Sequence, residues 1–162
     1  LPAVNFVDQP GFVIGTEAEK RGTIRRGTRA LTAVYQASVP WASVLVRKAF
    51  GVAGAAHSNA ERLQVRYAWP SGDWGSLPIE GGVAAAFRKE IAAAPDPKAK
   101  EAELEAQLRA SASPFRTAER FSVEEIIDPR DTRPLLCDWA ERAHELVAQE
   151  LHLGPKARGP RP

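Results

Sequence analysis

The sequence predicts an α/β fold built around a parallel sheet. Two short apolar segments, residues 4–7 and 44–46, have too few polar positions for a strand with one wet face. Strands buried on both faces are typical of parallel sheets. Each segment runs into a glycine-containing turn, and a helical stretch separates the two. This order of strand, turn and helix indicates a sheet whose parallel strands are joined through helices.

The helical stretch begins near Thr16 and ends before Pro40. Thr16 is followed three residues later by Glu19, which is the spacing of a capping box at a helix start. Gly22 and Gly27 interrupt the pattern. Either the helix is locally strained at these glycines, or a neighbouring element packs so closely that a Cβ atom would not fit.

The rest of the chain is predicted to add one strand and several helices. A strand is expected at residues 63–69 and a helix at 79–91. Residues 95–112 are rich in Ala, Glu, Lys and Leu, which favours an exposed helix anchored by Leu104 and Leu108. The remaining expectations are a short helix from 114 to 120, a last helix from about 132 to 151, and a disordered tail at 154–162.

The composition favours one soluble domain with little net charge. The 162 residues, of 17.6 kDa, suffice for a single core, and no apolar run approaches the roughly 20 residues that cross a membrane. The 22 basic and 20 acidic residues leave a charge of +2, too weak a field to hold a nucleic acid. We therefore expect neither nucleic acid nor a membrane as partner. Because the sequence starts at Leu1 and contains no Met, we expect a fragment of a longer polypeptide.

Two local features each leave more than one interpretation open. The single cysteine, Cys137, lies in a helical pattern, where a packed thiol is favoured over a nucleophile. One cysteine also fits a reducing compartment, so we expect a cytoplasmic location. A basic cluster could attract a phosphate-bearing ligand, but a solvated helix face or an interdomain contact is the simpler interpretation. It consists of Lys20, Arg21, Arg25, Arg26 and Arg29.

No side-chain pattern indicates a metal centre or a catalytic nucleophile. His57, His144 and His152 are far apart in sequence, and Cys137 is the one thiol, so no metal site is expected. The glycine motifs of nucleotide-binding proteins and the serine elbow of hydrolases are absent. His57 and Glu80 could act as acid–base groups, although a structural histidine and a helix-dipole partner are favoured for them.

Backbone amides are the remaining candidates. The turn at residues 51–54 follows a buried strand and leads into a helix, so the N–H groups of the first helical turn can face a ligand. Two such donors aimed at a developing enolate could lower a barrier by several kcal/mol, because losing one oxyanion donor costs roughly 2.7–4 kcal/mol elsewhere. Ordinary close packing accounts for the small residues equally well.

A series of short motifs follows a fixed order along nearly the whole chain. It includes Asp8, Pro10-Gly11-Phe12, Arg47-Lys48-Ala49, Tyr67-Ala68-Trp69-Pro70 and Ile126-Ile127-Asp128-Pro129. In this order the motifs resemble the carboxyltransferases of biotin-dependent acyl-CoA carboxylases, especially the β subunits of propionyl-CoA carboxylases. The resemblance is to the C-terminal half of the subunit. It implies a crotonase-like fold of ββα repeats without its first repeats, and an exposed, apolar sheet edge where those repeats are missing.

The resemblance also implies a domain assignment and a site made of backbone groups. Residues 1–153 would be the C-terminal part of the carboxyltransferase domain, on its carboxybiotin side. The implied oxyanion hole for biotin consists of the N–H groups of Val52 and Ala53, with biotin contacts at Gly51, Gly54, Gly11 and Phe12, and part of the acyl pocket at Ala55. The family usually has a glycine at the place of Val52 and an aromatic residue at that of Gly54. The valine could crowd biotin or conflict with a positive φ angle.

The implied reaction transfers CO2 from carboxybiotin to the α-carbon of an acyl-CoA such as propionyl-CoA or acetyl-CoA. The biotin enolate that remains can remove the α-proton, so the protein need not supply a base. Implied partners are the acyl-CoA, a biotin carboxyl carrier, a biotin carboxylase component, and the N-terminal carboxyltransferase domain of a neighbouring subunit in a homo-oligomer. The fragment alone should then be inactive. Two alternatives stay open: a diverged crotonase-superfamily CoA-thioester enzyme such as a decarboxylase, and a non-catalytic assembly module.

Overall fold

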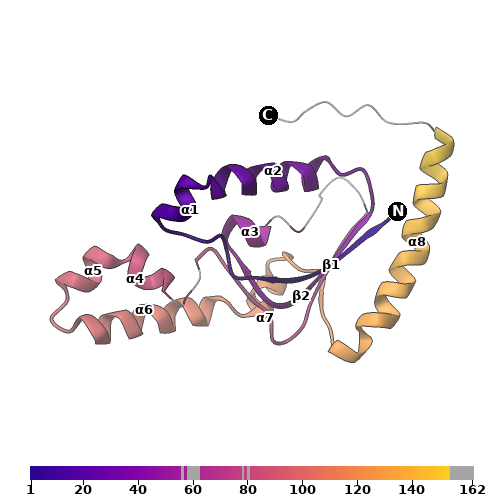
Figure 1. Cartoon of the computed structure of the whole chain (residues 1–162). Helices are drawn as coiled ribbons and strands as arrows, with labels where there is room; N and C mark the ends of the chain where they lie inside the picture. The colour runs from indigo at the N-terminus through magenta and orange to yellow at the C-terminus, as the bar shows by residue number, and fades with distance from the viewer. Residues whose placement is uncertain (56, 58–62, 78, 80, 154–162) are drawn as a thin grey trace.

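A parallel sheet forms the centre of the computed structural model, which describes residues 1–55, 57, 63–77, 79 and 81–153 (Figure 1). Within these residues the sheet has five strands, with the order β1-β2-β3-β5 and with β4 paired to β2. Every described strand pair is parallel, so the predicted parallel sheet is confirmed. The strands are β1 Ala3–Gln9, β2 Trp41–Phe50, β3 Gln64–Ala68, β4 Asp73–Gly75 and β5 Glu125–Ile126.

Strand β2 is the central strand and is buried on both faces. Leu45 packs with Val7 and Ala68 on one face. Ala42 packs with Trp139 and Ala143 on the opposite face. Consecutive side chains of a strand alternate between faces, so a strand with cores on both sides shows the near-continuous apolar run seen in the sequence.

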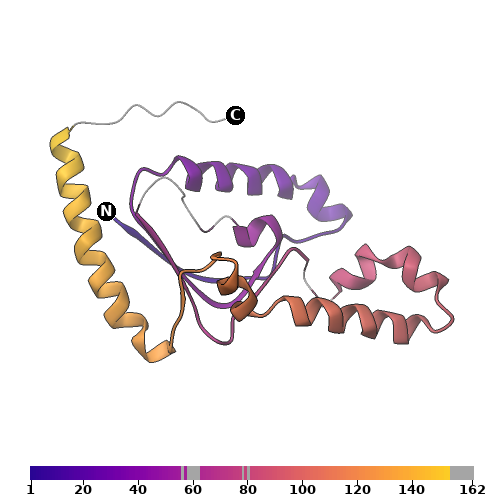
Figure 2. The same ribbon diagram turned by 180° about the vertical axis from the view of Figure 1, so that it is seen from behind.

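Helices cover the sheet and also form an arm beside it (Figures 1 and 2). The helices α1 Thr16–Lys20 and α2 Thr23–Gln36 run along one side of the sheet, and α8 Thr132–Leu153 packs against another side. The arm consists of α4 Gly82–Ala86, α5 Arg88–Ala93 and α6 Pro97–Ser111. The remaining helices are α3 Gly51–Ala55, α7 Pro114–Glu119 and the short 3-10 helix η1 Pro129–Asp131. None of the described helices is long and apolar enough to cross a membrane.

The arm has an apolar core of its own. Leu104 is buried there together with Val83 and Ala112, and Leu108 packs against them, so the predicted anchoring pair is confirmed. The prediction of a single helix over residues 79–91 is wrong. Two helices, α4 and α5, lie in this segment, with Phe87 between them. Phe87 leaves the helical conformation, with φ −105° and ψ 20°, while its ring packs against the same core.

Two further predictions are wrong. The capping box at Thr16 does not form, because Gly15 occupies the N-cap with φ 111° and Thr16 is already the first helical residue. The thiol of Cys137 is exposed and not packed. It precedes the buried Trp139 by two residues, which places the two side chains on nearly opposite faces of α8.

The two glycines that interrupt the first helical stretch have different roles. Gly22 adopts the left-handed conformation with φ 69° and separates α1 from α2. Gly27 has no such backbone requirement; a Cβ there would lie 2.3 Å from Cζ of Phe12. Close packing, one of the two alternatives, therefore accounts for Gly27, whereas Gly22 marks a break between two helices and not a strained helix.

The first strand leaves apolar side chains uncovered. β1 is at one end of the strand order, and Val4 and Phe6 are exposed. This confirms the expectation of an apolar sheet edge.

At the C-terminal end of α7, Phe121 occupies a turn position that usually holds a glycine. The N–H of Phe121 donates to the carbonyl of Ala118 at 2.8 Å, and the N–H of Ser122 donates to that of Thr117 at 3.0 Å. These two bonds form a Schellman motif, in which the residue at the place of Phe121 is usually glycine because its φ is positive. Phe121 has φ 54°, although its side chain is 88% exposed. The conformational cost is thus not offset by burial within the described part of the chain.

We predict that Phe121→Gly raises the free energy of unfolding by about 1 kcal/mol, because it relieves a left-handed conformation that is unfavourable for residues with a Cβ. Urea unfolding at neutral pH measures the change. Phe115→Gly is the matched control, since Phe115 is 57% exposed within α7. There glycine should lower the stability by roughly 0.5–1 kcal/mol. Equal losses for both variants would contradict the prediction.

Candidate active site

The turn that follows β2 is the centre of the candidate site. Gly51 begins α3 with φ +61°, a conformation that favours glycine. Among the described residues, Phe121 is the one non-glycine residue with positive φ, so Val52 has an ordinary backbone conformation. The expected conflict between Val52 and a positive φ is therefore absent. Val52 is 59% exposed, whereas Ala53 is 3% exposed, so of these two residues Val52 forms the surface of the turn.

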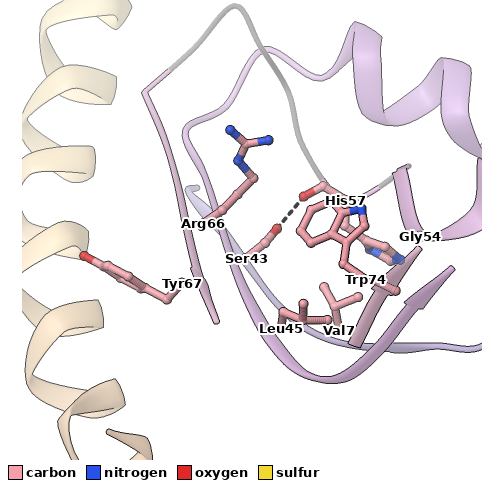
Figure 3. Close-up of a pocket in the computed structure, with 9 residues that line it drawn as sticks. Val7, Ser43, Leu45, Gly54, His57, Arg66, Tyr67 and Trp74 are labelled. Atoms are coloured by element: carbon pink, nitrogen blue, oxygen red, sulfur yellow. Dashed lines mark hydrogen bonds between the residues drawn. The ribbon is translucent and has the colours of Figure 1, made fainter. Parts of the chain in front are cut away.

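Gly54 is required by close packing of α3 on the end of β2. A Cβ at this position would lie 2.5 Å from the carbonyl carbon of Ala49, which is backbone and cannot rotate away. The family's usual aromatic residue at this position would need a different path of the turn. Figure 3 shows the indole of Trp74 beside Gly54, and Trp74 packs against the core that contains Val7 and Ala49. An aromatic ring is thus present here, but it comes from β4.

We predict that Gly54→Ala lowers the free energy of unfolding by roughly 1–3 kcal/mol, the usual cost of forcing extra atoms into a packed interior. Urea unfolding is again the measurement. Val52→Ala, in the same helix but exposed, should change the stability by less than about 0.5 kcal/mol. If Gly54→Ala is as stable as Val52→Ala, the close contact with Ala49 is not a constraint.

An irregular pairing of β1 and β2 lies immediately before the turn. Val7 pairs with Leu45, but Gln9 pairs with Ala49, so the register shifts at Asp8. The carboxylate of Asp8 accepts hydrogen bonds from Nε and Nη2 of Arg47, the shorter at 2.7 Å, and from the N–H of Lys48 at 3.2 Å. Asp8 thus binds both the side chain and the backbone of the irregular segment of β2.

The hydrogen bond from Arg47, more than any other interaction, holds the pKa of Asp8 below its ordinary value of 3.8. A carboxyl group with a lowered pKa in the folded state stabilises the fold when it is ionised. Its contribution is fully present above pH 3.8 and is lost as the pH falls through the lower folded value.

We therefore predict that the difference in unfolding free energy between the natural chain and Asp8→Asn is constant at neutral pH and shrinks when the pH falls below about 4. The effect should be modest because the pair is exposed and screened by water. Denaturant unfolding across pH 3–7 checks it, with Asp138→Asn on the exposed side of α8 as control. A difference that grows on acidification would contradict the assignment.

Four of the residues expected at the biotin site line two separate hollows. Gly51 and Val52 line a polar cleft of about 650 Å³. Gly11 and Phe12 line an apolar groove of about 720 Å³, together with Lys48 and Phe50. Phe50 directly precedes Gly51, so the groove and the cleft adjoin at the end of β2.

The other expected site residues lie elsewhere. Gly54 lines a small internal cavity with His57 and Trp74 (Figure 3). The side chain of Ala55 lies outside the described residues, as does Glu80. The proposed disordered tail, residues 154–162, is outside them too.

The cleft beside Val52 contains functional groups that the sequence analysis missed. Two arginines, Arg116 of α7 and Arg120 at its C-cap, line it. Four hydroxyl-bearing residues complete its polar surface: Ser76, Ser111, Thr117 and Ser122. The signal was present in the sequence, because arginines four residues apart on a short helix face the same side.

His57 is half-buried, and its backbone contributes to the packing of the turn. Its backbone carbonyl accepts a hydrogen bond from the hydroxyl of Ser43, drawn as the dashed line in Figure 3. Burial lowers the pKa of the imidazole, which favours the neutral form at physiological pH. Among the residues that the structure describes, no group of three or more His, Cys, Asp or Glu side chains could hold a metal ion.

Comparisons with known proteins identify the fold and the family. The fold is α/β and crotonase-like, as in solved carboxyltransferase structures. The crystal structure of transcarboxylase 12S with methylmalonyl-coenzyme A and methylmalonic acid bound covers 99% of this chain, with a TM-score of 0.74 and 36% identity. The chain belongs to the carboxyl transferase domain family, whose pattern matches residues 1–151.

Two curated relatives show the range of proteins to which the chain is similar. The carboxyltransferase subunit of propionyl-CoA carboxylase from Haloferax mediterranei is 39% identical over 138 residues, which is 82% of this chain and 26% of the relative. The alpha subunit of methylmalonyl-CoA decarboxylase from Veillonella parvula is 32% identical over 160 residues, 98% of this chain and 30% of the relative. The chain thus spans between a quarter and a third of the length of these relatives.

Proposed function

We propose that this chain forms the carboxybiotin-binding part of the carboxyltransferase of a biotin-dependent acyl-CoA carboxylase. The observation that carries the proposal is the turn after β2, where the start of α3 at Gly51 and Val52 lines a cleft of about 650 Å³. The N–H groups in the first turn of a helix have no partner within that helix. Donors of this kind stabilise an oxyanion without contributing a titrating group.

The residues of the turn fit a ureido ligand. The cleft of about 650 Å³ is roomy enough for a bicyclic ring, and Val52 has the exposed surface needed for contact. The N–H groups of Val52 and Ala53 would hold the ureido oxygen. Carboxybiotin held there would supply the carboxyl group and a base for the α-proton of the acyl-CoA. The chain would therefore bind and orient the ligand and stabilise negative charge through backbone groups.

The partners proposed for this chain follow from the same function. They are an acyl-CoA, a biotin carboxyl carrier with its biotin carboxylase component, and an N-terminal carboxyltransferase domain from a neighbouring subunit. Two observations support an oligomer. Val13 and Ile14 are exposed apolar residues beside the groove that contains Phe12. The related transcarboxylase 12S is described as a hexamer with substrate bound. A cytoplasmic location and inactivity of the chain alone remain parts of the proposal.

A second function is favoured by one relative. The similarity to the alpha subunit of a methylmalonyl-CoA decarboxylase extends over 98% of the chain. A decarboxylase would remove the carboxyl group of methylmalonyl-CoA as its net reaction, whereas a carboxylase would add one to propionyl-CoA. The two functions share the chemistry at the turn and differ in the direction of net transfer.

Replacing Val52 tests the role of the turn. In a full-length subunit containing this sequence, Val52→Pro removes one N–H, and we predict a loss of roughly 100- to 1000-fold in the rate of carboxyl transfer from methylmalonyl-CoA to free biotin. Val52→Ala keeps the N–H and should transfer within a few-fold of the natural protein. Thermal unfolding of both variants verifies that they are folded. Unchanged transfer by Val52→Pro would rule out this donor.

A further inference from the structure

The cleft beside Val52 is lined by positively charged side chains. Among the described residues that line it, the charged ones are Arg116 and Arg120, and none is an aspartate or glutamate. The whole chain, in contrast, carries nearly equal numbers of basic and acidic residues, with a net charge of +2. A concave surface with two positive charges and no negative one attracts an anionic ligand.

Both guanidinium groups are available to such a ligand. Arg116 and Arg120 are exposed, and no carboxylate of the described residues forms an ion pair with either. Some arginines of the described part are paired, such as Arg66 with Glu124 at 3.2 Å and Arg130 with Asp128 at 2.6 Å. Many others on the surface are not, and what distinguishes Arg116 and Arg120 is that both line one cleft.

The guanidinium groups indicate which kind of anion the cleft would bind. Its planar set of N–H donors matches a carboxylate in a bidentate arrangement, which a lysine cannot reproduce. Arg116 and Arg120 are four residues apart at one end of α7, so their side chains can reach one anion from the same side. The Val52 turn lines the same cleft and would hold the neutral end of the same ligand.

We propose that Arg116 and Arg120 bind the carboxylate that the reaction transfers, which is a specificity determinant beyond the oxyanion turn. This proposal rests on the proposed function. The transferred group is a carboxylate on the donor and again on the acyl-CoA product. Between these states the C–N bond to the ureido group breaks and a C–C bond to the acyl α-carbon forms, while the α-proton passes to the ureido group. Neutral CO2 is not held by the arginines.

The arginines should therefore affect affinity for carboxylated ligands more than the rate of the chemical step. Methylmalonyl-CoA and propionyl-CoA differ only in the carboxylate, which makes their comparison specific for this contact. An acyl-CoA without the carboxylate should bind equally well whether the arginines are present or not.

Equilibrium binding to a full-length subunit containing this sequence tests the proposal by calorimetry. We expect methylmalonyl-CoA to bind about tenfold more tightly than propionyl-CoA, in keeping with a charge-assisted pair. In Arg116→Gln/Arg120→Gln this ratio should fall to about one, with the Kd of propionyl-CoA unchanged. Arg116→Lys/Arg120→Lys keeps both charges and should retain part of the ratio.

Lys98→Gln is the control for net charge, because Lys98 is exposed on α6 and lines none of the hollows described above. It should leave the ratio unchanged. Thermal unfolding verifies that Arg116→Gln/Arg120→Gln is folded. If this variant still binds methylmalonyl-CoA tenfold more tightly than propionyl-CoA, the arginines do not bind the carboxylate. In that case intact transfer to biotin by the natural protein would leave the proposed function standing. Absence of transfer by the natural protein would instead overturn both proposals.

Discussion

The irregular pairing of β1 and β2 at Asp8 is the constraint on which the candidate site depends. The sheet keeps a regular parallel register up to Val7 and Leu45 and then shifts, so that extra residues of β2 stand opposite Asp8. The carboxylate of Asp8 binds both the guanidinium of Arg47 and the N–H of Lys48 in this segment. An unpaired backbone donor in a sheet is costly, and here a side chain from the neighbouring strand satisfies it.

This one junction sets the position of both hollows. On the β1 side the chain continues into Gly11 and Phe12, whose ring occupies the space that a side chain at Gly27 would need. On the β2 side it continues into Gly51 and α3, which packs on Ala49 so closely that position 54 must be glycine. The groove and the cleft adjoin because their walls leave neighbouring strands at the same end of the sheet. Ligands of parallel α/β sheets are bound at this end of the strands.

The sequence predicted the central strand β2 well because it is buried on both faces and is therefore almost continuously apolar. It did not predict the short strands β4 and β5. It predicted the place of α6 from a helix-forming composition with Leu104 and Leu108 as apolar anchors. It failed where the outcome depends on tertiary contacts: Phe87 divides a helix to fill the core of the arm, and Gly15 takes the cap that Thr16 was expected to provide. The turn at Gly51 was predicted from small residues, yet the roles of Gly51 and Gly54 differ in a way that spacing alone does not reveal. Arg116 and Arg120 were missed because their spacing places them on one side of α7 but does not reveal that this side lies beside Val52.

The central claim is that the turn after β2 serves carboxyl transfer through biotin. The most direct test follows the carboxyl carbon of labelled methylmalonyl-CoA in a full-length subunit that contains this sequence, with and without free biotin. We expect the label to appear on biotin and turnover to require biotin. Release of the label as CO2 at the same rate without biotin would contradict it and would indicate a CoA-thioester decarboxylase that works without this cofactor.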